Sequence, residues 1–81
     1  MLNTYIFEII IEPDEEGFHV YCPLLKGCHT WGKDRKEAMK NIEEAVELYI
    51  EDMLEAGDPL PDEARLKQVR GFDSPSVAVA V

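Results

Sequence analysis

The sequence predicts an α+β fold in which one sheet is backed by a single long helix. Apolar residues alternate with polar ones in short segments between Tyr5 and Trp31, which is typical of strands. From Asp34 to Ala56, apolar residues recur at three- and four-residue steps, which predicts a helix. A final apolar run, Val77–Val81, predicts one more strand. The expected order is β-β-β-α-β, a four-strand sheet with the helix packed on it, in one domain covering residues 1–81.

The first predicted strand spans Tyr5–Glu12 and is rich in β-branched and aromatic residues. One face of it is apolar and carries Tyr5, Phe7, Ile9 and Ile11. The turn Pro13–Gly17 follows, in which proline fixes φ, aspartate favours local hydrogen bonds and glycine supplies a positive φ. Phe18–Cys22 is then the second strand, so the two strands form a hairpin.

A third strand is expected at Cys28–Trp31, before the helix Asp34–Ala56. Asp34 is a suitable N-cap for this helix, Glu37 can complete a capping box, and Gly57 suits its C-terminal end. The apolar face of the helix should meet the apolar faces of the strands. The expected core therefore includes Phe7, Ile9, Val20, Ile42, Val46 and Tyr49.

The segment Asp58–Pro75 is polar and contains several prolines, and a short helical turn is expected at Asp62–Gln68. The last strand, Val77–Val81, is apolar on both faces, which favours an inner or interface position. A right-handed crossover through the long helix would place this strand parallel to a strand already in the sheet.

The chain is short and strongly acidic. It has 81 residues, with 17 Asp and Glu against 8 Lys and Arg, and a formal net charge of -9. Such a charge repels phosphate backbones, so we expect no direct binding of nucleic acid.

The sequence contains no apolar run of the roughly 20 residues that a membrane span needs. Its N-terminus lacks the pattern of a signal peptide. We therefore expect a cytoplasmic protein with reduced cysteines and no contact with membranes.

His19, Cys22, Cys28 and His29 supply the imidazoles and thiols of the chain, in the spacing His-x2-Cys-x5-Cys-His. Zinc needs ligands that converge on one centre, but strand alternation sends His19 and Cys22 to opposite faces. Adjacent strand residues point apart, so His29 is poorly placed to activate Cys28 as a nucleophile. The numerous carboxylates are best interpreted as a solvated face. We expect no metal, no cofactor and no enzymatic activity.

Several motifs follow one another in a fixed order. They are the strand Tyr5–Glu12, Pro-Asp-Glu-Glu-Gly-Phe at 13–18, Cys-Pro-Leu-Leu-Lys-Gly-Cys at 22–28, Gly32, Glu37-Ala38 and Leu-Glu-Ala-Gly-Asp-Pro-Leu-Pro at 54–61. In this order and spacing, from Tyr5 to the final strand, the chain resembles the HicB-like antitoxin family. Asp34 stands where the family usually has threonine, and it keeps an N-cap side chain.

The resemblance implies a partial ribonuclease-H-like fold without nuclease activity. It also implies a partner, a small basic toxin of the HicA type that cleaves mRNA, whose active site the antitoxin covers. Many members of the family add a C-terminal DNA-binding domain; this chain ends at Val81, so no such domain and no promoter binding are expected. The alternative function is a stand-alone oligomeric interaction module that has no toxin partner.

The hairpin tip is the first candidate for the toxin contact. Asp14, Glu15 and Glu16 are consecutive acids at this tip, where carboxylates can take the places of RNA phosphates in a cationic site. The surface near Trp31 is the second candidate. Both predictions depend on the existence of a toxin partner.

The small size of the chain also predicts self-association, because a core of this size supplies only a few kcal/mol of net stability. Leu48 and Leu54 lie off the apolar stripe of the helix, and the last strand is apolar on both faces. We expect a homodimer or tetramer with an interface that includes Leu48, Leu54, Val77, Val79 and Val81.

Overall fold

A computed structural model describes residues 4–60 and 75–80 of the chain. In order, its elements are β1 (Thr4–Glu8), β2 (Ile10–Pro13), β3 (Phe18–Tyr21), β4 (His29–Gly32), α1 (Arg35–Ala56) and β5 (Ser76–Ala80). The predicted α+β class is confirmed, and one helix stands between the N-terminal strands and the last strand. The helical turn expected at Asp62–Gln68 lies outside the described residues, as does Val81.

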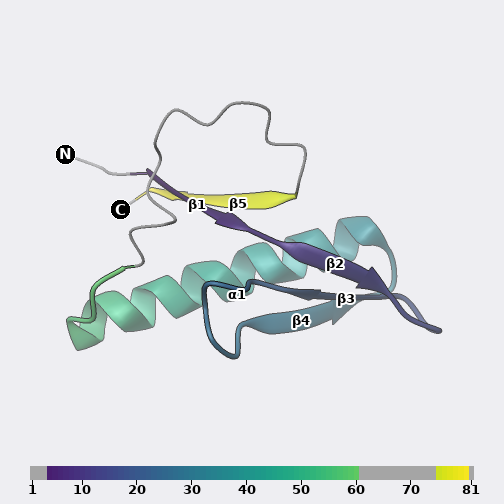
Figure 1. Cartoon of the computed structure of the whole chain (residues 1–81), viewed down its shortest axis with the longest axis horizontal. Coiled ribbons are helices and arrows are strands. Elements are labelled where there is room, and N and C mark those ends of the chain that lie inside the picture. Colours follow the sequence, from purple (N-terminus) through teal and green to yellow (C-terminus); the bar gives the residue numbers. More distant parts are fainter. Residues whose placement is uncertain (1–3, 61–74, 81) are drawn as a thin grey trace.

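The strands form two antiparallel ladders, β1–β5 and β2–β3–β4, so the prediction of a single four-strand sheet is wrong. The first predicted strand is interrupted at Ile9, whose backbone N–H donates to the carbonyl of Pro75 at 2.9 Å. Ile9 therefore extends the contact with the β5 end of the chain, while β2 pairs with β3. Figure 1 shows β1 and β2 as consecutive arrows that serve two different partners.

The last strand runs antiparallel to β1, with Phe7 opposite Val77, so the expected parallel pairing is also wrong. The crossover rule applies when a helix leads directly back into the sheet that it left. Here the chain from Gly57 to Pro75 can span about 60 Å when extended, which is enough to reverse direction before β5. The direction of β5 therefore does not follow from the direction of α1.

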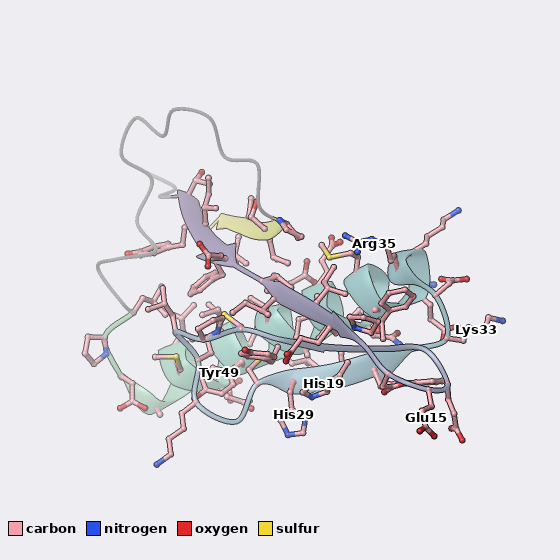
Figure 2. The ribbon with its side chains drawn as sticks, turned by 45° about the vertical axis from the view of Figure 1, so that its right-hand side comes forward. Glu15, His19, His29, Lys33, Arg35 and Tyr49 are labelled. Atoms are coloured by element: carbon pink, nitrogen blue, oxygen red, sulfur yellow. The ribbon has the colours of Figure 1, made fainter. Side chains whose placement is uncertain are left out.

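The β2–β3–β4 sheet has two contrasting faces. Register pairs Ile11 with Val20 and Val20 with Thr30, and the burial of Val20 marks this as the core face. The neighbouring positions belong to the opposite side, which we call the outer face. Its residues are Ile10, Glu12, His19, Tyr21, His29 and Trp31. Figure 2 shows His19 and His29 side by side on the side of the sheet away from α1.

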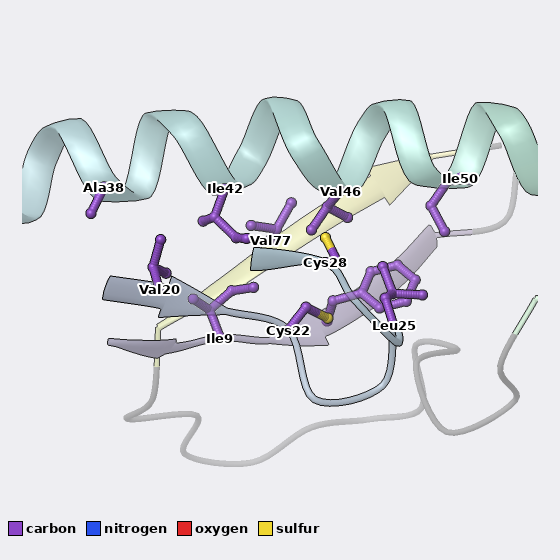
Figure 3. Close-up of a cluster of buried hydrophobic side chains, with 11 residues drawn as sticks. Ile9, Val20, Cys22, Leu25, Cys28, Ala38, Ile42, Val46, Ile50 and Val77 are labelled. Atoms are coloured by element: carbon purple, nitrogen blue, oxygen red, sulfur yellow. The ribbon is translucent and has the colours of Figure 1, made fainter. Parts of the chain in front are cut away.

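One face of α1 packs on the strands and forms the hydrophobic core (Figure 3). The buried residues are Phe7, Ile9, Val20, Cys22, Leu25, Cys28, Ala38, Ile42, Val46, Ile50 and Val77. Five of the six predicted core residues are confirmed. Tyr49 is only partly buried, because its hydroxyl donates to the carbonyl of Lys26 at 3.0 Å, while Ile50 is fully buried.

The predicted N-cap at Asp34 and the C-terminal Gly57 are confirmed, whereas the expected capping box differs, because the Glu37 carboxylate accepts from Lys33 and not from Asp34. The Asp34 carboxylate accepts the N–H of Glu37 at 2.7 Å, and the Glu37 carboxylate accepts the N–H of Lys33 at 3.0 Å. Gly57 adopts a left-handed conformation with φ 76° and ends the helix. No helix within the described ranges is both long and apolar enough to cross a membrane.

Gly17 and Gly32 are required by close packing. The expected positive φ at Gly17 is wrong, because the positive-φ glycines in the described part of the chain are Gly27 and Gly57. A Cβ atom on Gly17 would meet the carbonyl oxygen of Gly32 and lie 2.7 Å from Cζ2 of Trp31. A Cβ atom on Gly32 would meet the backbone N of Ala38 and lie 2.6 Å from its Cα. These glycines let the hairpin, β4 and the start of α1 approach one another.

We predict that Gly32→Ala lowers the free energy of unfolding by about 1–3 kcal/mol, because the added methyl group forces α1 away from β4. Urea denaturation followed by circular dichroism measures this change. Lys36→Ala, at an exposed position near the start of the same helix, is the control and should change stability by less than about 0.5 kcal/mol. Equal stability of Gly32→Ala and the wild type would show that the contact is not tight.

Candidate functional site

The hairpin tip between β2 and β3 is organised by one carboxylate. Oδ1 of Asp14 accepts the backbone N–H groups of Glu16 and Gly17, each at 2.8 Å. The N–H of Asp14 in turn donates to the carbonyl of Gly17 at 2.9 Å. Asp14 therefore acts as the structural centre of the turn. Glu15 and Glu16 are exposed, and Glu15 projects from the tip in Figure 2.

Trp31 joins the tip to the sheet. Its indole N–H donates to Oδ2 of Asp14 at 3.1 Å, across 17 residues of sequence. The backbone carbonyl of Trp31 accepts the side-chain amide of Asn41 at 2.8 Å, which ties β4 to α1. Trp31 nevertheless remains 40% exposed. The structure thus brings the two candidate toxin-contact regions, the tip and Trp31, into one continuous surface.

The hydrogen bonds of the tip lower the pKa of Asp14 below its ordinary value of 3.8. The N–H of Glu16 is the largest cause, and the Gly17 N–H, the Trp31 indole and the charge of His19 act in the same direction. Partial desolvation opposes them. The carboxylate is therefore ionised at neutral pH, as its role as a double acceptor requires.

The outer face carries an aromatic cluster that sequence reasoning did not identify as a site. The ring centroids of His19 and Tyr21 are 5.7 Å apart, and those of His19 and His29 are 5.6 Å apart. An open pocket of about 470 Å³ lies beside these rings. Its lining comes from β3, β4 and the loop between them: His19, Tyr21, Cys22, Pro23, Leu25, Lys26, Gly27, Cys28 and His29. Strand alternation predicts that His19 and Tyr21 lie on the same face of β3. The proximity of His29 could not be predicted in this way, because it depends on how β4 is aligned with β3.

The thiols and the imidazoles do not form one centre. Cys22 and Cys28 are buried in the core, whereas His19 and His29 lie on the outer face. Burial raises the pKa of both thiols, and the proximity of Cys22 raises that of Cys28 further. Within residues 4–60 and 75–80, no group of three or more His, Cys, Asp or Glu side chains is placed to hold a metal ion. Neutral, buried thiols are also poor nucleophiles.

The residues predicted for self-association are dispersed. Leu48 is 62% exposed and Leu54 is 49% exposed, but they lie about 120° apart around α1. Val77 is only 4% exposed within its own chain, which leaves little of its side chain for an interface. It belongs to the core against Phe7, and Val79 packs partly against the same core.

Residues 7–79 match the family described as HicB_like antitoxin of bacterial toxin-antitoxin system. This match extends over nearly the whole chain. The chain belongs to the HicB-like antitoxin family. As a HicB-like antitoxin it is one component of a toxin-antitoxin system, as the resemblance in its motifs predicted. Its α+β architecture is that of the HicB antitoxins.

Related sequences and solved structures agree with this assignment. A UPF0150 protein of Synechocystis is 43% identical over 62 residues, which cover 75% of this chain and 78% of that protein. A UPF0150 protein of Archaeoglobus fulgidus is 50% identical over 46 residues, covering 56% of this chain and 67% of the relative. This chain is also similar to one chain of the HicA3 and HicB3 toxin-antitoxin complex. The two chains are 34% identical with a TM-score of 0.55, and the match covers 76% of this chain and 67% of that chain.

Two further solved structures share the fold. A protein of Thermus thermophilus has a TM-score of 0.62 at 30% identity, with 78% of this chain and 83% of that chain covered. The N-terminal domain of the Burkholderia pseudomallei antitoxin HicB has a TM-score of 0.60, and the match covers 94% of each chain. Its identity of 22% makes this second likeness one of fold.

We predict that the tip loosens in acid. Because the pKa of Asp14 is lowered in the folded chain, its contribution to stability is complete above the ordinary value of 3.8 and is lost as pH falls through the folded pKa. The NMR signal of the Trp31 indole N–H should report this transition with a midpoint below 3.8. Asp14→Asn should remove the transition. A midpoint at or above 3.8, or the same transition in Asp14→Asn, would contradict this assignment.

Proposed function

We propose that this antitoxin binds a small basic toxin of the HicA type and neutralises it by covering its active site. The observation that supports this most directly is the 34% identity to a chain of the HicA3 and HicB3 complex. The net charge of -9 supports it independently, because an enzyme that cleaves RNA must present cationic groups to phosphates. The proposed role is binding without catalysis.

The hairpin tip is the proposed point of entry. Glu15 and Glu16 are exposed on a turn whose backbone is held by Asp14, so little conformational freedom is lost when they bind. Carboxylates held in this way resemble the phosphates of an RNA strand in charge and in hydrogen-bond acceptors. Trp31 lies directly behind the turn and adds apolar contact area.

A stand-alone module without a toxin is the alternative function, and the genome decides between the two. A neighbouring reading frame for a small basic protein favours the toxin partnership.

We also propose that the chain forms a homodimer or tetramer, since Leu48 and Leu54 leave apolar side chains on the solvent side of α1. Light scattering at micromolar concentration should give at least twice 9.2 kDa, and a monomer would contradict this assembly.

We predict that Glu15→Lys with Glu16→Lys slows association with the basic protein encoded beside this gene and weakens binding about tenfold or more. The matched control is Glu43→Lys with Glu44→Lys, which changes the net charge equally on exposed positions of α1. Both variants retain Asp14 and therefore the turn. Titration calorimetry at two salt concentrations and a growth-rescue assay supply the measurements.

The tip variant should also show a shallower salt dependence than the wild type, while the helix variant stays close to the wild type. Equal losses in the two variants would mean that net charge drives binding and the tip does not. No binding of the neighbouring protein by the wild-type chain would refute the proposed function.

A further inference from the structure

Within the described residues, the outer face of the β2–β3–β4 sheet lies on the side opposite α1, where Glu12, His29 and Trp31 are exposed and His19 and Tyr21 are half-buried. Two histidines, a tyrosine and a tryptophan gather there, together with Ile10 and Glu12. Within the described ranges, α1 packs on the other face, where Val20 is buried (Figures 2 and 3). The rings of His19, Tyr21 and His29 contact one another but gain no cover from the helix.

Folding alone does not account for this concentration of rings. The core of the described residues lies on the α1 side of the sheet. Exposed apolar area is unfavourable by about 25 cal/mol per Å² relative to burial. Threonine also favours strands and would suit a solvated strand face. Tyrosine and tryptophan with a polar rim are typical of surfaces that become buried in complexes.

The distribution of charge on this face indicates the kind of partner. Glu12 stands opposite His19 in the register, and Asp14 holds the Trp31 indole at 3.1 Å. With Glu15 and Glu16, these residues place four carboxylates at one end of the face. Aromatic rings bordered by carboxylates suit a guanidinium or ammonium group, which stacks on the rings while it pairs with the acids.

We propose that the outer face is the main docking surface for the cationic toxin. Arginine or lysine side chains of the toxin stack on the Tyr21 ring and on the Trp31 ring, and they pair with the carboxylates of Glu12 and the hairpin tip. This inference rests on the proposed function and deepens it. The tip then guides the encounter through its charge, whereas the outer face supplies the contact area that slows dissociation.

The pocket at the other end of the face fixes the orientation of the toxin. Tyr21, Pro23, Leu25 and His29 line much of its wall, and its volume of about 470 Å³ is enough for a large side chain. An apolar side chain of the toxin enters this pocket, while its cations lie toward the hairpin tip. The face thus changes from acidic to apolar along the strands, which excludes the reversed orientation.

Two other occupants fit the observations less well. Single-stranded RNA also stacks on exposed rings, but its phosphates would lie against Glu12 and the acidic tip. A second copy of this chain would bring the same carboxylates face to face and carries the same charge of -9. The cationic side chains of a basic protein can stack on the aromatic rings and pair with the carboxylates.

The test compares the wild-type chain with a double variant, Tyr21→Thr with His29→Thr, which places β-branched residues on the strands. The probe is an inactive form of the basic protein encoded beside this gene, titrated by calorimetry. We expect affinity to fall about tenfold or more with an unchanged salt dependence. Glu47→Gln with Glu51→Gln, at exposed positions of α1, is the control and should bind like the wild type.

Unchanged affinity in the double variant overturns the docking surface but leaves the toxin partnership intact, whereas no binding by the wild type overturns both. Folding is checked by circular dichroism.

If the variant does not fold, the binding surface is located by NMR instead. When the basic protein is added to the labelled wild-type chain, the chemical-shift changes should be largest at His19, Tyr21 and His29. Changes confined to α1 or β5 overturn the proposal. A single-stranded RNA that binds the wild type, but not a folded double variant, also overturns it in favour of RNA.

Discussion

The packing of α1 against one face of the β2–β3–β4 sheet is the interaction on which the rest of the structure depends. Ile42, Val46 and Ile50 are fully buried there, and each such side chain contributes about 1.5–3 kcal/mol. The absence of side chains at Gly17 and Gly32 lets hairpin, strand and helix approach at backbone distance. Because the described core lies on one side of this small sheet, the other side is not covered by α1 (Figure 2), and we propose that it binds the toxin.

Local signals predicted most of the elements. The N-cap at Asp34 and the left-handed Gly57 could be predicted because capping involves residues three or four positions apart. Strand positions followed from alternation over a few residues. Pairing did not, because it depends on contacts between distant segments. The pairing of β1 with β5, and the resulting division at Ile9, has no counterpart in the local pattern of Tyr5–Glu12.

The candidate site shows the same division between local and distant signals. The acidic tip and the local hydrogen bonds of Asp14 could be predicted from the sequence, but the bond from the Trp31 indole could not, because Trp31 is 17 residues away. Together these bonds make Asp14 a structural residue and leave Glu15 and Glu16 as the exposed acids of the tip whose carboxylates make no such bonds within the described part of the chain. The gathering of His19, Tyr21 and His29 likewise required the register of β3 and β4. Strand alternation predicted on which face each residue lies. Their proximity follows only from the pairing of β3 with β4.

An acidic tip, an aromatic sheet face and a pocket form one surface on the side of the sheet opposite the core. We propose that this surface docks the toxin and that the exposed side of α1 does not. A crystal structure of the chain with the basic protein encoded beside it tests this most directly. We predict that the cationic surface of the toxin lies on Tyr21, Trp31 and the hairpin tip. A toxin bound to the exposed side of α1, with the outer face in solvent, would contradict the central claim.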